Sequence, residues 1–326
     1  MRHVLAVVTA VAGATVAVSL HGQSIFTYAG GGTTDGRAAT TLALHDVGGM
    51  TTDPQGNVYF SETSGNFVHR LDVATGTLTV YAGNGGGSFS GDGGPATRAA
   101  LKRPFGLALD DNGNLYIADH DNNRIRKVDV HTGVISTFAG VADYPGSLGD
   151  GGPATQAWVY QPHGLAWSHG NLYITQDGYN ENRVRKIAPD GSISTVAGTG
   201  PEGSSGDGAA AAAAQLSAPG AVAVDAAGNV YIADSGNNRI RRVNAANGNI
   251  ETVVGTGATG DPIGDGGPGT AATLFFPLAL TLDANGIVFL SDTYHNRIRR
   301  YDPASKVITT FAGNGGYHDE DGMPAL

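Results

Sequence analysis

Short apolar runs separated by glycine-rich turns occupy most of this chain of 326 residues. Within residues 106–140 the runs GLALD, NLYIAD, RIRKVD and VISTFAG follow one another, and Asn-Gly, a polar loop and Thr-Gly separate them. Runs of about 5–7 residues bounded by such turns predict strands joined as hairpins. Helical periodicity is nearly absent outside the N-terminal segment, so the pattern predicts an all-β protein.

The same order of runs recurs along the chain, and each unit ends in an aromatic residue or Val followed by Ala-Gly or Val-Gly. These endings fall at residues 28–30, 81–83, 138–140, 196–198, 253–255 and 311–313, which are 53 to 58 residues apart. A four-stranded antiparallel sheet repeated at this period predicts a β-propeller, whose blades bury their faces by stacking around an axis. Two β-sandwich domains are the alternative, which the strict repetition disfavours.

The repeats predict five complete blades, at approximately residues 31–83, 84–140, 141–198, 199–255 and 256–313. Residues 24–30 add a lone strand before them, and DGMPA within residues 314–326 matches the start of a further unit. We expect a six-bladed ring that is truncated in this sequence, because closure removes exposed strand edges. A closed ring of five blades is the competing interpretation.

The N-terminal segment carries Arg2 and His3 ahead of apolar or small residues from Val4 to Leu20. This pattern predicts a signal peptide, which we place at residues 1–23, and a secreted or periplasmic protein that leaves the membrane after cleavage. An uncleaved anchor helix is the alternative, although the run is marginal for a bilayer span. The sequence contains no cysteine, which excludes disulfides, cysteine-based zinc sites and a thiol nucleophile.

The negative charge of the chain disfavours one class of partner, nucleic acids. Its formal net charge is −10, which disfavours nucleic acid as a ligand because such binding neutralises phosphates with Lys and Arg. Most Lys and Arg residues lie in the third strand of each unit, as Arg124, Arg126 and Lys127 do. Their regular placement predicts an architectural role, in which Arg side chains tie neighbouring blades to carboxylates.

The segments GNLYIADHDNNRIRKV, GNVYIADSGNNRIRRV and IVFLSDTYHNRIRRY resemble NHL repeats, in the long bacterial form that carries GDGGPAT between blades. The resemblance covers nearly all of residues 24–326, although the first unit departs from it at Glu62 and Phe67. The third unit has two extra residues in its polar loop, DGYNEN. The resemblance implies a propeller that is commonly six-bladed and closed by sharing strands between its two ends.

The segment GDGGPAT and its near-copies form the first candidate site, with one acidic residue in each: Asp92, Asp150, Asp207 and Asp265. A phosphate-binding loop would need a following Lys and Ser or Thr, and these are missing. A calcium site needs several converging oxygen ligands, whereas each loop supplies one carboxylate, so calcium is only a weakly supported cofactor. The equal length of the copies and an apolar residue nine positions after each Asp predict instead a connector with a short helical turn and a buried plug.

The loops between the second and third strands form the second candidate site, through Asp119, Asp234 and Asp292. The run DHDNN resembles the start of an EF-hand, but Arg124 and Val130 stand where that motif needs Gly and Glu. We therefore expect these Asp side chains to accept hydrogen bonds from turn N–H groups and to pair with the following arginine.

A third candidate is His163, which precedes a first strand and has Trp158, Tyr160 and Trp167 nearby in sequence. One histidine is not a zinc site, and the first strands lack the polar residues that a lactonase centre would need. A Gly-x-Ser-x-Gly elbow in the required context is also missing. The cluster is typical of packing, with a ligand role as the alternative.

These observations favour an exported, non-catalytic scaffold that binds a protein or carbohydrate and needs no cofactor. The connectors and the loops between second and third strands share one face of a propeller. We expect that face, with the acidic residues above and His163, to bind the partner. A propeller enzyme, such as a metal-assisted lyase or a lactonase, is the alternative function.

Overall fold

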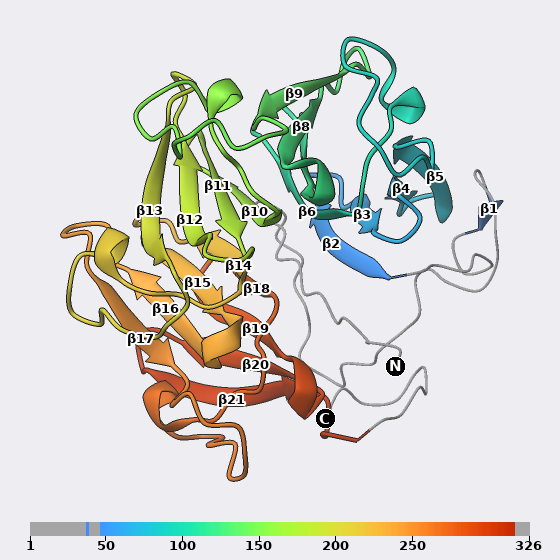
Figure 1. Cartoon of the computed structure of the whole chain (residues 1–326). Coiled ribbons are helices and arrows are strands. Elements are labelled where there is room, and N and C mark those ends of the chain that lie inside the picture. The colour runs from blue at the N-terminus through green and yellow to red at the C-terminus, as the bar shows by residue number, and fades with distance from the viewer. Residues whose placement is uncertain (1–36, 39–45, 317–326) are drawn as a thin grey trace.

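The computed structural model describes residues 37–38 and 46–316, and within them the chain is an all-β propeller of five blades (Figure 1). Each blade contains four antiparallel strands in sequence order, and the first gains a short edge strand, β1 (Arg37–Ala38). The predicted fold class and the five four-stranded blades are thus confirmed. The described helices are single 3-10 turns, and none is long and apolar enough to cross a membrane.

The strands have the following bounds. Blade one contains β2 (Val47–Thr52), β3 (Val58–Glu62), β4 (Phe67–Asp72) and β5 (Thr77–Ala82). Blade two contains β6 (Pro104–Leu109), β7 (Leu115–Asp119), β8 (Arg124–Val128) and β9 (Ile135–Ala139). Blade three contains β10 (Pro162–Ser168), β11 (Asn171–Gln176), β12 (Asn182–Ile187) and β13 (Ile193–Gly200). Blade four contains β14 (Pro219–Val224), β15 (Val230–Asp234), β16 (Arg239–Val243) and β17 (Ile250–Val254). Blade five contains β18 (Leu280–Leu282), β19 (Val288–Asp292), β20 (Arg297–Asp302) and β21 (Val307–Ala312).

The turn between the first two strands of a blade shows how local sequence sets the hairpin. In blade two, Asp110 accepts hydrogen bonds from the backbone N–H groups of Asn112 and Asn114, at 2.9 and 2.8 Å. Gly113 has φ of +85°, a left-handed conformation that costs glycine little. The same Asp and Gly recur in blades one, four and five, so the turn chemistry repeats with the fold.

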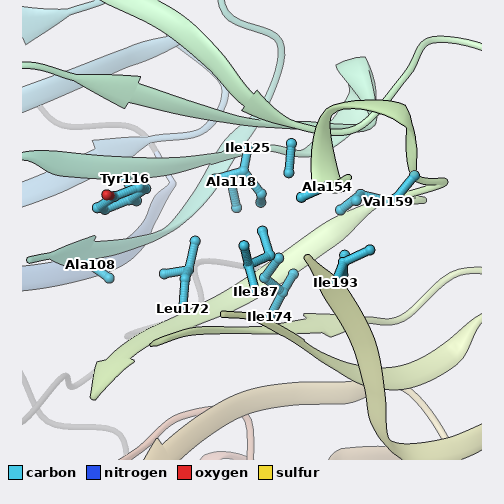
Figure 2. Close-up of a cluster of buried hydrophobic side chains, with 12 residues drawn as sticks. Ala108, Tyr116, Ala118, Ile125, Ala154, Val159, Leu172, Ile174, Ile187 and Ile193 are labelled. Atoms are coloured by element: carbon cyan, nitrogen blue, oxygen red, sulfur yellow. The ribbon is translucent and has the colours of Figure 1, made fainter. Parts of the chain in front are cut away.

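Most of the core lies between adjoining blades, and one smaller cluster lies within blade one. Figure 2 shows the interface of blades two and three, where Tyr116, Ala118 and Ile125 face Leu172 and Ile174. These side chains are almost completely buried, and burying one Ile or Leu contributes about 1.5–3 kcal/mol. The inner strands contact each other in series from β2 through β6, β10 and β14 to β18 (Figure 1).

The connector between blades covers the outer edge of the blade that it enters. In blade two, Gly93 donates to the carbonyl of Ile135 at 2.9 Å, and Ile135 donates to that of Gly94 at 3.0 Å. A 3-10 turn follows, and the plug residue Leu101 is fully buried, as expected. The same pairing occurs in blades three to five, and β1 makes it with β5 in blade one. Pairing of this kind removes part of an exposed strand edge, which is otherwise a site of aggregation.

The expected signal peptide at residues 1–23, the lone strand at residues 24–30 and most of residues 314–326 lie outside the described residues. The described blades number five, and a sixth is not among them.

Candidate functional site

The connectors and the loops between second and third strands meet on one side of the propeller, which we call the loop face. Hydrogen bonds join the two kinds of loop directly. Asp121 donates its backbone N–H to the carbonyl of Lys102 at 3.1 Å, and Gly236 donates to that of Ser217 at 2.9 Å. The turns between first and second strands and between third and fourth strands lie at the opposite ends of the strands, and we call that side the turn face.

A buried arginine joins two of the predicted acidic residues in blade two. Arg126 on β8 donates to Asp92 of the connector at 2.6 Å and to Asp119 at the end of β7 at 3.1 Å. Thr137 on β9 donates to the other oxygen of Asp92 at 2.6 Å. Arg126 and Asp119 are completely buried, so this network fastens the connector to three strands of its own blade.

The same network recurs in blades four and five. Arg241 joins Asp207 and Asp234, at 2.7 and 3.2 Å. Arg299 joins Asp265 and Asp292, at 2.8 and 2.9 Å. The structure therefore brings six of the predicted acidic residues together in pairs, each around one arginine. The arginines fasten each connector to the blade that follows it, whereas the sequence suggested ties between neighbouring blades.

The arginine that pairs with each Asp is the third residue of its strand-opening Arg-Ile-Arg, not the first. Arg124, the first, donates instead to the carbonyl of Asn122 at 2.9 Å. Asp119 accepts hydrogen bonds from the backbone N–H of Lys102 at 2.7 Å and from the Asn122 amide at 2.8 Å. The expected capping by turn donors is thus present, and the position of the paired arginine is the correction.

Two blades depart from the pattern. In blade three Gln176 replaces the second Asp, and Arg185 pairs with Asp150 alone at 2.6 Å while donating to Gln176 at 3.2 Å. In blade one His69 and Glu62 take the places of the Arg and Asp, with 2.8 Å between the His69 Nε2 and Glu62 carboxylate atoms. These two blades therefore have fewer charge-to-charge contacts in the network than blades two, four and five.

Burial dominates the electrostatics of the network. It raises the pKa of the Asp119 and Asp234 carboxyls, while backbone, Asn and Arg donors oppose the rise. It lowers the pKa of the Arg185 guanidinium, while the negative charge of Asp150 opposes the fall. Each of these carboxylates is already paired with an arginine of the same blade. Their role at the loop face is therefore to hold the loops in place.

The predicted His163 lies at the start of the inner strand β10 and contacts both adjoining blades. Its Nδ1 donates to the carbonyl of Gly220 in blade four at 2.8 Å. Its ring stacks on Phe105 of blade two, with 4.5 Å between centroids. The neighbouring His120 ring is 6.4 Å away, and its Nε2 lies 3.6 Å from the Asp177 carboxylate. His163, His120 and Asp177 form a small polar cluster between blades two and three.

The surroundings of this cluster hold His163 neutral. Burial lowers its pKa, and the charge of Asp177 and the hydrogen bond to Gly220 only partly offset that effect. For Asp177, burial raises the pKa, but the interactions with the nearby His120 and His163 outweigh that effect, so the pKa is lowered. With Nδ1 donating, a neutral His163 carries its lone pair on Nε2 and can accept a hydrogen bond there.

The loop face also carries exposed aromatic side chains, which the sequence reasoning missed. Every exposed large aromatic residue in the described part of the chain lies in a connector or in a loop between second and third strands: Phe89, Tyr144, Tyr179, Phe275 and Tyr294. The exposed large hydrophobic residues of the turn face are aliphatic, Val73 and Val130. The extra residues of DGYNEN, which include Tyr179, were a signal that could have pointed to this surface.

The described part of the chain shows no candidate metal centre. Within residues 46–316, no three His, Asp or Glu side chains converge in a way that could hold a metal ion. In blades two, four and five the acidic residues meet in pairs around an arginine, whose charge takes the place that a cation would occupy.

Comparison with known proteins points to one group of propellers. A model of the Teneurin NHL domain matches residues 85–147 and 199–262. NHL repeat-containing protein 2 from Bos taurus is 27% identical over 76% of this chain and 37% of its own length. SUPPRESSOR OF QUENCHING 1 from Arabidopsis thaliana is 27% identical over 88% of this chain and 28% of its own length. Teneurin-3 from Mus musculus is 30% identical over 60% of this chain and 10% of its own length. The chain therefore spans well under half the length of these curated relatives.

Solved structures show the same fold at low identity. A crystal structure of a nidogen/laminin complex superposes with a TM-score of 0.57 at 18% identity, over 83% of this chain and 81% of that one. A virginiamycin B lyase from Staphylococcus aureus superposes with a TM-score of 0.50 at 17% identity, over 81% and 69%. Likeness at this level describes the architecture alone, because one fold serves many functions.

Proposed function

Since this chain belongs to the NHL-repeat β-propeller family, we propose that it is an exported, non-catalytic scaffold that binds a partner through its loop face. The observation that carries the proposal is the distribution of exposed aromatic residues. All five of them gather on the loop face, and exposed Tyr and Phe are enriched at binding surfaces.

The loops that present these residues are firmly held. Arg126, Arg185 and Arg299 fasten the connectors that carry Phe89, Tyr144 and Phe275 to their blades through charge-assisted hydrogen bonds. A surface that is already ordered loses little conformational entropy on binding. Rigid loops with exposed rings therefore suit a binding role better than a gating or catalytic one.

The proposal includes export to the cell exterior or the periplasm. It rests on the apolar run from Val4 to Leu20 behind Arg2. N-terminal sequencing of the protein recovered from the medium or periplasm tests this part. We expect cleavage close to residue 23, and an intact N-terminus in the membrane fraction would refute it.

A photo-crosslinking experiment tests the binding role. The amino acid p-benzoylphenylalanine replaces Tyr179 on the loop face or Val130 on the turn face, and the full chain is irradiated in its native secretory compartment. We expect a defined covalent adduct from position 179 and only background from position 130. Equal labelling from both faces, or none from the loop face, would refute the proposal.

An enzymatic role is the second candidate, and the cluster of His163, His120 and Asp177 is what favours it. A neutral histidine with a fixed tautomer can act as a base or a hydrogen-bond acceptor. A metal-assisted lyase or lactonase predicts that a chelator such as EDTA lowers the melting temperature. Under the scaffold proposal EDTA leaves the melting temperature unchanged, and so the two roles are distinguished.

We also propose that the complete ring has six blades. The support is the outer face of blade five, where Phe289 and Ile298 are half-buried. Their counterparts in blade four, Tyr231 and Ile240, are fully covered by blade five. A further blade would cover Phe289 and Ile298 in the same way.

A further inference from the structure

Blade three presents a continuous stack of aromatic side chains on the loop face. Tyr144 meets Trp158 edge to face with 5.6 Å between ring centroids, and Trp158 stacks on Tyr160 at 5.4 Å with 21° between the ring planes. Tyr144 is 58% exposed, and Tyr179 on the neighbouring loop is 85% exposed. Rings that pack on one another at their base and reach solvent at their tips form a preorganised contact surface.

The stack is joined to the inserted loop of the same blade. Gly178, next to Tyr179, packs so closely on the Tyr160 ring that a side chain at this position would collide with it. Trp158 is nearly buried beneath the surface, and its carbonyl accepts a hydrogen bond from Arg185 at 3.1 Å. The aromatic stack and the loop that carries Tyr179 therefore form one unit.

In blade two, arginine side chains cover the face of an exposed aromatic ring on the loop face. Phe89, in the connector of blade two, lies under two guanidinium groups of its own blade. The distances to the ring centroid are 4.0 Å for Arg124 and 4.7 Å for Arg126. Such cation–π contacts are attractive because the ring face is electron-rich.

The aromatic stack of blade three has no internal cation of this kind. Among the cation–π contacts of the described residues, none involves Tyr144, Trp158, Tyr160 or Tyr179. The two loops of this blade, residues 141–161 and 177–181, contain no Lys or Arg. By contrast, the connector of blade two contains Arg98, Lys102 and Arg103.

Negative charge surrounds the stack. Asp143 precedes Tyr144, and Asp177 and Glu181 flank Tyr179. Asp143 and Tyr179 are exposed, whereas Glu181 is paired with Arg183. A cation would be attracted both by the faces of the uncovered aromatic rings and by the carboxylates beside them.

We propose that this aromatic stack docks an arginine- or lysine-rich segment of a partner protein. The inference rests on the proposed binding role of the loop face and names the chemistry of its partner. Guanidinium groups lie over the rings of Tyr144 and Tyr179, as Arg124 lies over Phe89, while the exposed Asp143 supplies a salt bridge. A neutral oligosaccharide would use the rings but would gain nothing from the carboxylates.

Isothermal titration with synthetic probes tests the proposal on the full chain. The probes are the dodecapeptide (Arg-Gly)6, its counterpart (Glu-Gly)6 and chitohexaose, each at low ionic strength. We expect (Arg-Gly)6 to bind and its affinity to fall as salt is added, because exposed charges are screened. We expect no binding of (Glu-Gly)6 and none of chitohexaose.

Variants locate the binding. Each exposed cation–π contact changes affinity by roughly 2- to 5-fold, so Y144A/Y179A is expected to lose roughly 4- to 25-fold. Tyr179→Phe keeps the ring and is expected to bind within 2-fold of the parent. Val130→Ala removes an exposed apolar side chain on the turn face and serves as the control, with unchanged affinity. Equal melting temperatures establish that the variants are folded.

The proposal is overturned if Y144A/Y179A binds (Arg-Gly)6 as the parent does, or if Val130→Ala weakens binding equally. It is also overturned if chitohexaose binds at Tyr144 and Tyr179 while the cationic peptide does not. An adduct from position 179 that (Arg-Gly)6 fails to compete away would refute the cationic partner and leave the binding role of the loop face intact. Absence of any loop-face adduct would refute the binding role itself.

Discussion

Replacing Arg241 with Met is expected to destabilise the propeller strongly. Arg241 is completely buried and neutralises two carboxylates, Asp207 and Asp234. Asp207 is about half exposed and can be hydrated once the arginine is gone, so its loss of a partner costs little. Asp234 is fully buried and would keep only neutral donors, from Ser217 and Asn237. Leaving one buried charge unpaired costs about 3–5 kcal/mol, a large part of a typical stability of about 5–15 kcal/mol.

Urea denaturation of the parent and the variant measures this free energy. The matched control is Arg242→Met in the same strand, where a partly exposed guanidinium pairs with the exposed Glu251. That control is expected to cost less than about 1 kcal/mol. Adding Asp234→Asn to Arg241→Met removes the stranded charge and is expected to restore part of the loss, as a double-mutant cycle would record. The reasoning fails if both arginine variants cost the same, or if Asp234→Asn restores nothing.

Three further predictions concern packing, backbone conformation and pH. Ile240→Ala empties a fully buried site and should cost about 2–5 kcal/mol, while Ile298→Ala on the half-open outer face of blade five should cost clearly less in the same urea titration. Gly206 and Gly208 both have positive φ, but a Cβ added at Gly206 would lie only 2.5 Å from the Ala214 Cβ, whereas one at Gly208 would meet nothing. Gly206→Ala should therefore lower the melting temperature more than Gly208→Ala. Because burial lowers the pKa of His163 in the folded state, the unfolded chain binds the extra proton, and stability should fall as pH drops below about 6.5. Urea midpoints at pH 7.5 and pH 5 should show this loss in the parent and in the exposed-site control His131→Gln, and a smaller loss in His163→Gln.

The repeat made the fold predictable in detail. Each blade carries its own turn chemistry, such as Asp110 with Gly113, and its own plug, such as Leu101. These are local signals that recur at a fixed period, and five repetitions leave little room for another architecture. The equal length of the connectors also predicted correctly that they follow a fixed path with a short helical turn.

The candidate site was only partly predictable. The sequence singled out Asp92 and Asp119 separately, but 27 residues separate them, and nothing local indicates that both face Arg126. The contact between His120 and Asp177 likewise joins two different blades. Such pairs depend on how blades stack and how connectors fold back, which composition and spacing do not reveal.

The sequence by itself determined the all-β class, the four-strand unit, its turns and the acidic balance, because each of these is set by neighbouring residues or by composition. The tertiary structure decided how the charges are used. It placed each acidic pair around a buried arginine, where burial makes an internal partner necessary. It also gathered Tyr144, Trp158, Tyr160 and Tyr179 into one surface without an internal cation, since residues far apart in a chain become neighbours only when loops share a face.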